Sequence, residues 1–298
     1  MKNNYIKSPL NYVGGKHKLL PQILPLFPEQ INTFVDLFCG GFNVGINVGA
    51  NRVIGNDIEP HLINLLNMMK NYNVDDLIKE IDDIVDKYGL SNTSLYGYEY
   101  YNTDSSKGVA NYNKEKYFKL RKDYNENPSD LLFFVLIIFA FNNQIRFNSK
   151  GEFNMPVNKR DFNGNIKKNI RLFVNELNNK ECIFFNKNFT EIKIENLTKK
   201  DFIYLDPPYL LGCASYNEQD GWNLSLEKDM YCLCDKLNNN CIKFAMSNVI
   251  KHKGKINKHL EDWGSNYNIH YLNYNYNNCN YHSLNKESET IEVLITNY

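Results

Sequence analysis

The sequence predicts an α/β protein in which a parallel sheet with helices on both faces is interrupted by a mainly helical insert. Residues 34–38 and 52–56 are apolar runs of strand length, and the first of them enters a glycine-rich turn. Within residues 64–88 and 112–123, apolar side chains instead recur at the spacing of amphipathic helices. Another strand-like run follows at residues 202–205, so both ends of the chain are expected to build the sheet.

The composition is that of a soluble globular protein with one large domain or two modest ones: 298 residues, 43% hydrophobic and 23% charged. The net charge of +0 argues against a strongly cationic surface but is compatible with a local basic cleft. The first residues form no charged-then-apolar leader, and the longest apolar run, 131–141, is shorter than the about 20 residues that span a bilayer. We therefore expect a cytoplasmic protein without a membrane partner.

The seven cysteines show no paired spacing, and no histidines cluster near Cys232 and Cys234. Free thiols in a reducing compartment are the expected state, and no metal site is expected.

The first strand run leads into a turn that contains Gly40 and Gly41, and a helix is expected after it. A strand, a glycine-rich turn and a helix together form a cofactor-binding unit, although the G-x-G-x-x-G spacing of dinucleotide sites is absent. The second run ends at Asp57, about 20 residues past the turn, where an acidic residue holds a ribose diol. A helix N-cap before Pro60 is the alternative role for Asp57, and both roles are compatible.

Upstream, residues 14–16 read Gly-Gly-Lys. This tripeptide is either a plain turn or a device that places Lys16 over a carboxylate or phosphate. The Walker A spacing is absent, so ATP hydrolysis is disfavoured.

The run 202–205 ends in Asp206, Pro207, Pro208 and Tyr209. The exocyclic amine of an aromatic ring is a weak nucleophile because its lone pair is delocalised into the ring. A carboxylate and a backbone carbonyl that accept the amine protons localise that lone pair, and a tyrosine face stacks on the base. The two prolines stiffen the turn. An ordinary turn after a strand is the alternative interpretation.

The insert combines helical patterns with a hairpin pattern. Residues 64–88 and 112–123 have amphipathic helical spacing, and residues 131–141 are expected to form a buried helix. The polar stretch 90–108 is expected to be a loop. Residues 144–157 are expected to form a β-hairpin that bends at a glycine.

In this order, the motifs resemble those of the Dam-type (D-P-P-Y, class alpha) site-specific DNA adenine N6-methyltransferases. The similarity covers most of the chain and includes residues 11–16, 36–41, 56–58, 206–209 and the hairpin segment 142–156. Several separated motifs in one order are more specific than D-P-P-Y alone. The resemblance implies a Rossmann-like methyltransferase sheet with an inserted target-recognition domain. It also implies catalysis by Asp206–Tyr209.

The resemblance further implies S-adenosylmethionine as methyl donor, S-adenosylhomocysteine as product and no metal. By position, the loop from Asp36 surrounds the methionine part, Asp57 holds the ribose hydroxyls, and Tyr12 and Lys16 close over the donor. Many relatives carry an Asp-Phe pair at the donor adenine, and this chain has Asn188 there instead of Asp. The implied donor-binding residues are Tyr12, Lys16, Asp36, Phe38, Gly40, Gly41, Asp57, Ile58, Asn188, Phe189 and Asp206.

The hairpin is expected to read double-stranded DNA, because a two-stranded ribbon fits the major groove. Arg146 is expected to contact a base or a phosphate, since arginine is the usual bidentate reader of guanine. Lys150, Lys159 and Arg160 are expected to contact phosphates, with a solvated charge as the alternative. The implied DNA-binding residues are Asn142, Asn143, Gln144, Arg146, Asn148, Lys150, Pro156, Lys159 and Arg160.

The expected domain organisation is a catalytic domain split into residues 1–65 and 166–298, with target recognition at residues 66–165. The expected reaction is N6 methylation of a flipped-out adenine in GATC or a related palindrome, by a solitary methylase or by the partner of a restriction endonuclease. A monomer of bacterial, archaeal or phage type is expected. The alternatives are a cytosine N4-methyltransferase and a non-catalytic DNA-binding subunit. Cytosine C5 chemistry is excluded, since the chain has no Pro-Cys pair for the nucleophile.

Overall fold

The computed structural model describes residues 5–12, 14–211, 221–273 and 290–298. Contacts divide the chain into two compact units, each with its own buried apolar core. The first, here called the sheet unit, comprises Met1–Tyr5, Lys16–Ile58 and Glu181–Tyr298. The second, here called the helical unit, comprises Ile6–Gly15 and Glu59–Lys180.

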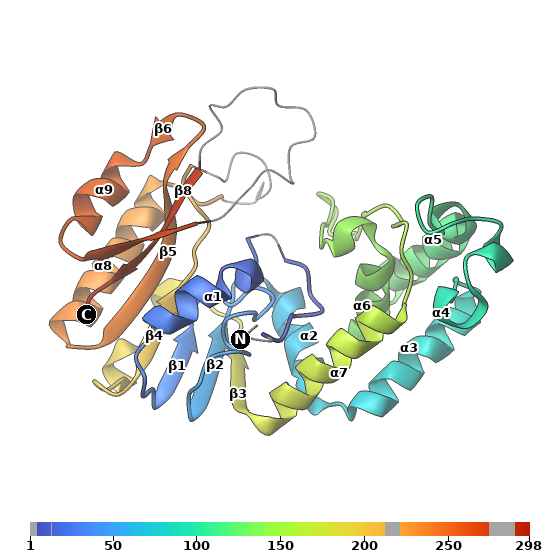
Figure 1. The fold of residues 1–298 in the computed structure, drawn as a ribbon, viewed down its shortest axis with the longest axis horizontal. Coiled ribbons are helices and arrows are strands. Elements are labelled where there is room, and N and C mark those ends of the chain that lie inside the picture. The colour runs from blue at the N-terminus through green and yellow to red at the C-terminus, as the bar shows by residue number, and fades with distance from the viewer. Residues whose placement is uncertain (1–4, 13, 212–220, 274–289) are drawn as a thin grey trace. The chain divides into compact units, whose positions relative to one another are not determined.

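The sheet unit contains a mixed sheet with the strand order β3-β2-β1-β4-β5-β8-β7, and β6 pairs with β5 (Figure 1). The strands from β3 to β5 run parallel, whereas β8 is antiparallel to both of its neighbours. This arrangement confirms the predicted α/β class, and three predicted strands appear as β1, β2 and β4. The bounds are β1 Thr33–Asp36, β2 Arg52–Asn56, β3 Glu181–Phe185, β4 Phe202–Leu205, β5 Lys243–His252, β6 Lys255–Ile256, β7 Asn268–Leu272 and β8 Thr290–Thr296.

One face of the sheet is covered by helices α8 (Leu224–Asn239) and α9 (Lys258–Gly264). Met230 of α8 and Leu260 of α9 are fully buried in the same apolar cluster as Ile203 of β4. The burial of such side chains supplies most of the driving force that holds helices on a sheet.

The opposite face is covered by the short helices α1 (Leu20–Ile23) and η2 (Leu24–Leu26) and the residue that follows them, Phe27. The ring centroid of Phe27 lies 4.8 Å from that of Phe202 and 5.6 Å from that of Tyr204. Alternate residues of β4 thus pack on opposite faces, as the period of two in a strand requires.

The helix expected directly after the glycine-rich turn is not formed, and residues 43–47 form consecutive turns instead. Phe42 has a φ of 61°, which lies outside the right-handed helical region. The N–H of Gly45 donates to the carboxyl of Asp36 at 3.0 Å. This side-chain acceptor at the end of β1 shapes the segment in a way that helical periodicity does not encode.

The helical unit confirms the predicted helices of the insert and adds detail at their ends (Figure 1). The predicted helical stretch 64–88 is two helices, because Asn73 accepts a hydrogen bond from the N–H of Asp75 at 2.9 Å and starts a new helix. The expected loop 90–108 contains a one-turn helix. The bounds are α2 Pro60–Asn71, α3 Val74–Tyr88, α4 Thr93–Tyr96, α5 Ala110–Glu126, α6 Asp130–Phe139 and α7 Gly164–Asn179.

The predicted hairpin is a turn with isolated antiparallel bridges, Phe147 to Phe153 and Ala140 to Val157, and has no regular strands. The side-chain oxygen of Asn148 accepts from the N–H groups of Lys150 at 2.9 Å and Glu152 at 3.0 Å. These hydrogen bonds tie the bend to a side chain, so the backbone ladder there is short.

Two features bear on the class of protein. Within the described residues, no helix is both long and apolar enough to cross a bilayer. The same part of the chain contains no group of three His, Cys, Asp or Glu side chains placed to hold a metal ion.

Gly108 precedes α5 and packs closely against the backbone of Lys159, which follows the hairpin. We expect its replacement by alanine to destabilise the protein. Its φ is +71°, and a Cβ there would overlap the backbone carbonyl oxygen of Lys159. Gly151 has a similar φ of +75° but open space around its Cβ position. Gly108→Ala should therefore lower the free energy of unfolding by about 3 kcal/mol, and Gly151→Ala by only about 1 kcal/mol, in urea titrations. Equal losses in the two variants would contradict the steric explanation.

Candidate active site

Acidic side chains from three separate motifs meet at the carboxyl edge of the sheet. In the sheet, β1 lies between β2 and β4, and Asp36 is in register with Gly55 on one side and Tyr204 on the other. Because all three strands run parallel, Asp36, Asp57 and Asp206 follow or end their strands at one edge. Open α/β sheets bind ligands at this edge.

Asp206 forms the centre of a buried polar cluster. Lys16, in the short helix η1 (Lys16–Lys18), places its Nζ 2.8 Å from Asp206 Oδ2. The Tyr209 hydroxyl donates to Asp206 Oδ1 at 2.9 Å and lies 3.0 Å from Glu292 Oε1. Lys16 Nζ is also 3.7 Å from Glu292 Oε1. The side chains of Lys16, Asp206 and Glu292 are 4%, 16% and 2% exposed.

Burial and charge set the protonation of this cluster. Burial disfavours the ammonium form of Lys16, but attraction by Asp206 and Glu292 outweighs it and raises the Lys16 pKa. Burial raises the pKa of Asp206, and the nearby Lys16 ammonium offsets only part of this effect. Burial, together with the two carboxylates, raises the pKa of the Tyr209 hydroxyl well above its ordinary value. The Tyr209 hydroxyl therefore keeps its proton at neutral pH and acts as a hydrogen-bond donor.

Asp36 and Asp57 each hold the glycine-rich turn. Asp36 accepts from Gly45, and Asp57 Oδ2 accepts from the N–H of Gly40 at 2.8 Å. Burial raises the pKa of Asp36 to about 8, so this carboxyl keeps its proton at neutral pH. The alternative role of Asp57 as a helix N-cap is wrong, because Glu59 caps α2 by accepting from His61.

Aromatic side chains line the same region. The ring centroid of Phe38 lies 5.4 Å from that of Phe189 and 5.8 Å from that of Trp222. Asn188 caps the short helix that begins at Phe189, and its side-chain oxygen accepts from the N–H of Thr190 at 3.0 Å. That oxygen has a structural partner, which the comparison with an Asp-Phe pair did not anticipate.

Asn56, at the end of β2, has an unpartnered buried acceptor. Its side-chain N–H₂ donates to the carbonyls of Leu37 and Lys187 at 3.1 and 3.0 Å, which fixes the orientation of the amide. Its Oδ1 is the one buried side-chain N or O atom without a hydrogen-bond partner among the described residues. Such an atom calls for an explanation, and a bound ligand or ordered water is the usual one.

The remaining residues of the predicted catalytic and donor-binding sets differ in exposure. Gly41 and Pro207 are buried, whereas Pro208 is partly exposed and Ile58 is 68% exposed. Tyr12 belongs to the helical unit and is partly exposed. Its neighbour in the 11–16 motif, residue 13, lies outside the described residues.

The predicted DNA-contact residues lie in the helical unit and differ in how their side chains are used. The amide of Asn143 donates to the carbonyls of Ile137 and Ile138 at 3.1 and 2.9 Å and so caps α6. Asn148 closes the hairpin turn. These two amides have structural partners that the sequence pattern did not indicate.

The charged members of the set are exposed. Arg146 donates through Nε to Asn154 Oδ1 at 2.7 Å, which holds its guanidinium along the hairpin. Arg160 donates to the Tyr98 hydroxyl at 3.2 Å. The other five members of the predicted set are exposed or partly exposed, as follows: exposed Asn142, Lys150, Pro156 and Lys159, and partly exposed Gln144.

Comparison with known proteins matches residues 12–278 to the D12 class N6 adenine-specific DNA methyltransferases. The chain belongs to this family. It is 43% identical to the modification methylase StsI of Streptococcus sanguinis and 41% identical to the type II methyltransferase M.FokI of Planomicrobium okeanokoites. Each of these alignments covers 99% of this chain but 43% of the relative, so the chain spans less than half the length of either. A DNA adenine methylase of Haemophilus influenzae is 30% identical over 67% of this chain and 63% of its own.

Within this D12-class chain, two residues of the site were missed by sequence reasoning. Glu292 lies in β8 among the apolar residues Ile291, Val293 and Leu294. A lone carboxylate in an otherwise apolar strand was the available signal, since such a group is rarely buried without partners. Trp222 follows the segment after D-P-P-Y, where no local pattern marks it.

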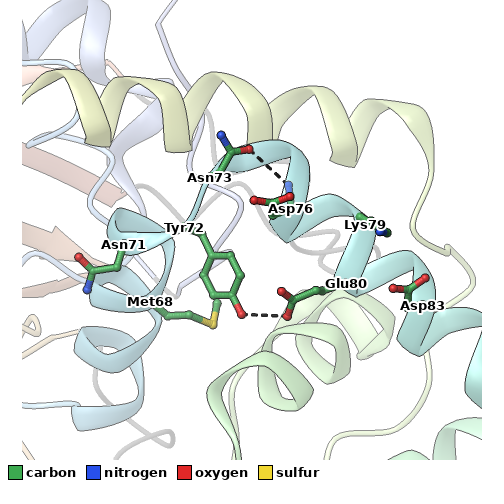
Figure 2. Close-up of a pocket in the computed structure, with 8 residues that line it drawn as sticks. All are labelled: Met68, Asn71, Tyr72, Asn73, Asp76, Lys79, Glu80 and Asp83. Carbon is green, nitrogen blue, oxygen red and sulfur yellow. Dashed lines mark hydrogen bonds between the residues drawn. The ribbon is translucent and has the colours of Figure 1, made fainter.

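The D12-class chain also has a pocket in the helical unit, at the junction of α2 and α3 (Figure 2). Its wall includes the carboxylates of Asp76, Glu80 and Asp83, and the Tyr72 hydroxyl donates to Glu80 at 2.9 Å. Asn73 in the same wall is the N-cap of α3. The polar groups of this pocket are thus used in the junction between the two helices, and the pocket is explained by that junction.

Proposed function

We propose that this chain transfers a methyl group from S-adenosylmethionine to N6 of an adenine in double-stranded DNA. The observation that carries the proposal is Asp206, which is held by Lys16 and Tyr209 at the carboxyl edge of the sheet in a member of this family. A carboxylate fixed in this way is a suitable acceptor for the protons of an aromatic amine.

The residues at this edge fit the proposed methyl donor. When bound, S-adenosylmethionine supplies an activated methyl group on a cationic sulfur. Asp206 and Glu292 share the ammonium of Lys16, and Asp57 adds a further carboxylate, so the edge favours a cation. The unpartnered oxygen of Asn56 and the aromatic rings nearby add an acceptor and an apolar surface for the rest of the donor.

Individual roles toward the donor follow from these positions. The turn that Asp36 and Asp57 hold through Gly45 and Gly40 would surround the methionine part. Asp57, at the end of β2, would hold the ribose hydroxyls. Phe38, Phe189 and Asn188 would lie at the adenine. Tyr12, Lys16, Gly41 and Ile58 complete the proposed set.

The D-P-P-Y residues would hold the acceptor base. A base inside a duplex is out of reach of this buried edge, so the adenine must be flipped out, at a cost of a few kcal/mol. Asp206 and the Pro207 carbonyl would then accept the two N6 protons and localise the nitrogen lone pair. The Tyr209 ring would stack on the base, and Pro208 would stiffen the turn. The positive charge that develops on N6 would be stabilised by Asp206 before a proton is lost.

The helical unit would carry target recognition. Arg146, held by Asn154 on the hairpin, is the best placed base reader, and Lys150, Lys159 and Arg160 would contact phosphates. GATC or a related palindrome is the proposed site. Asn142, Gln144 and Pro156 would flank the base contacts, whereas Asn143 and Asn148 would act by shaping the hairpin.

The names of the relatives support a role in restriction and modification, since StsI is a modification methylase and M.FokI a type II methyltransferase. A cognate endonuclease is therefore the proposed functional partner, and a cytoplasmic monomer is the proposed form. Family membership argues against the cytosine N4 alternative. The ion-paired Asp206 argues against a non-catalytic subunit.

The test is to incubate the protein with plasmid DNA and S-adenosylmethionine and to map modified bases by single-molecule sequencing. We expect N6-methyladenine in one fixed motif, and no modification when the donor is omitted. N4-methylcytosine, or unmodified DNA despite donor binding by calorimetry, would overturn the proposal.

A further inference from the structure

We infer that Glu292 is a positioning residue that receives the Tyr209 hydroxyl and the Lys16 ammonium when an amine engages Asp206. The inference rests on the proposed function for the identity of that amine, the N6 group of adenine. It assigns a role in the reaction to a residue outside the D-P-P-Y motif.

Both oxygens of Asp206 are engaged by the chain itself. Oδ2 is 2.8 Å from Lys16 Nζ, and Oδ1 accepts from the Tyr209 hydroxyl at 2.9 Å. An incoming amine therefore competes with two donors that already hold the carboxylate. A donor that simply lost its acceptor in a buried site would cost about 1–3 kcal/mol, and more when charged. The site needs a second acceptor beside Asp206.

Glu292 provides that acceptor. Its Oε1 lies 3.0 Å from the Tyr209 hydroxyl and 3.7 Å from Lys16 Nζ, so both donors of Asp206 already face it. The tyrosine hydroxyl carries one proton, which can point to either carboxylate without movement of the ring. Transfer of this hydrogen bond to Glu292 would leave Asp206 Oδ1 open to the amine while every buried donor keeps a partner.

The sheet holds Glu292 in place for this role. Residue 292 is in register with Val249 of β5 and with Leu272 of β7, so strands flank it on both sides. Its side chain is 2% exposed. Burying a carboxylate is unfavourable unless it is paired. Two of its partners are the side chains that also hold Asp206, which argues for a function beyond stability.

The test is Glu292→Gln, which keeps the shape of the side chain and removes its charge. Under single-turnover conditions we expect the rate of methyl transfer to fall roughly 10- to 100-fold, with donor affinity nearly unchanged. The charged and titratable groups that face Asp206 are Lys16, Glu292, Tyr209, Tyr204 and Asp36. Glu292 raises the pKa of Asp206, so the variant should also move the acidic limb of the pH–rate profile to lower pH.

Glu227→Gln is the matched control, because Glu227 is also a fully buried carboxylate of the sheet unit. It accepts from Trp222, Tyr231, Asn248 and Asn257, and these partners differ from those of Asp206. This variant should lose stability without moving the acidic limb. Should Glu292→Gln fold poorly, a double-mutant cycle of Glu292→Asp with Tyr209→Phe replaces it. We expect non-additive effects, since both changes act on one hydrogen bond.

A readout that needs no methyl transfer separates this inference from the proposed function. The pKa of Asp206 can be followed by carbon NMR of labelled aspartate, assigned with an Asp206→Asn variant. We expect a lower pKa of Asp206 in Glu292→Gln than in the unmodified protein. An unmoved Asp206 titration would overturn the inference, whatever the activity. Absence of adenine methylation by the unmodified protein would overturn the proposed function alone.

Discussion

Replacing Asp206 with alanine is expected to lower the rate of N6 methyl transfer by about a thousandfold or more. The change removes the acceptor that would localise the lone pair of the amine and stabilise its developing charge. Glu292 stays 3.7 Å from Lys16 Nζ in the unmodified geometry, so the buried ammonium keeps one carboxylate and the fold should persist. Single-turnover methylation and donor binding by calorimetry measure the two effects separately. Loss of both together would point to a structural role.

Asp201→Asn is the control for removing a carboxylate charge from the same strand. Asp201 precedes β4 at the opposite end from Asp206 and accepts from the N–H of Thr33 at 2.9 Å and of Thr198 at 2.7 Å. It holds the start of the strand and lies far along it from the proposed chemistry. The variant should be less stable but should keep its methylation rate. A thousandfold loss of the methylation rate in Asp201→Asn as well would contradict the catalytic role of Asp206.

Replacing Asp36 with asparagine is expected to stabilise the protein, and to do so more at pH 8 than at pH 5. The pKa of Asp36 rises from its ordinary 3.8 to about 8, chiefly through burial. Between these values the unfolded chain loses the proton and the folded protein keeps it, so Asp36 makes folding less favourable as the pH rises. The variant removes this penalty, and Asn can still accept from Gly45. Thermal or urea unfolding should show a gain on the order of 3 kcal/mol larger at pH 8 than at pH 5.

The same substitution should leave donor affinity nearly unchanged at neutral pH, because the protonated Asp36 carboxyl carries no charge there. For the pH dependence of stability, Asp201→Asn is the contrasting variant, because the pKa of Asp201 is shifted in the opposite direction. Burial opposes the ionisation of Asp201, but hydrogen bonds led by the N–H of Thr198 outweigh it and lower its pKa. The ionised Asp201 carboxylate stabilises the folded protein fully above its ordinary pKa, and this stabilisation is lost only at acid pH. The deficit of this variant should be constant between pH 5 and 8, and a flat response of Asp36→Asn would contradict the burial of that carboxyl.

Local patterns were sufficient for the elements that depend on near neighbours. Apolar runs predicted β1, β2 and β4, and amphipathic spacing predicted the helices of the insert, because burial of one face is written at a fixed period. The local patterns failed after β1, where Asp36 accepts a hydrogen bond from the N–H of Gly45 and no helix forms. They also predicted regular hairpin strands where Asn148 instead closes a turn with isolated bridges.

The sequence by itself determined the D-P-P-Y motif, the glycine-rich turn and the acidic residue after the second strand, because each is a short run of residues with its own chemistry. Only the tertiary structure decided which side chains complete the site. Tyr209 and Glu292 are 83 positions apart, and Lys16 reaches Asp206 from the other end of the chain. Such pairs arise when parallel and antiparallel strands bring distant segments to one edge of the sheet. A buried carboxylate such as Glu292 is stable only with the partners that this folding supplies.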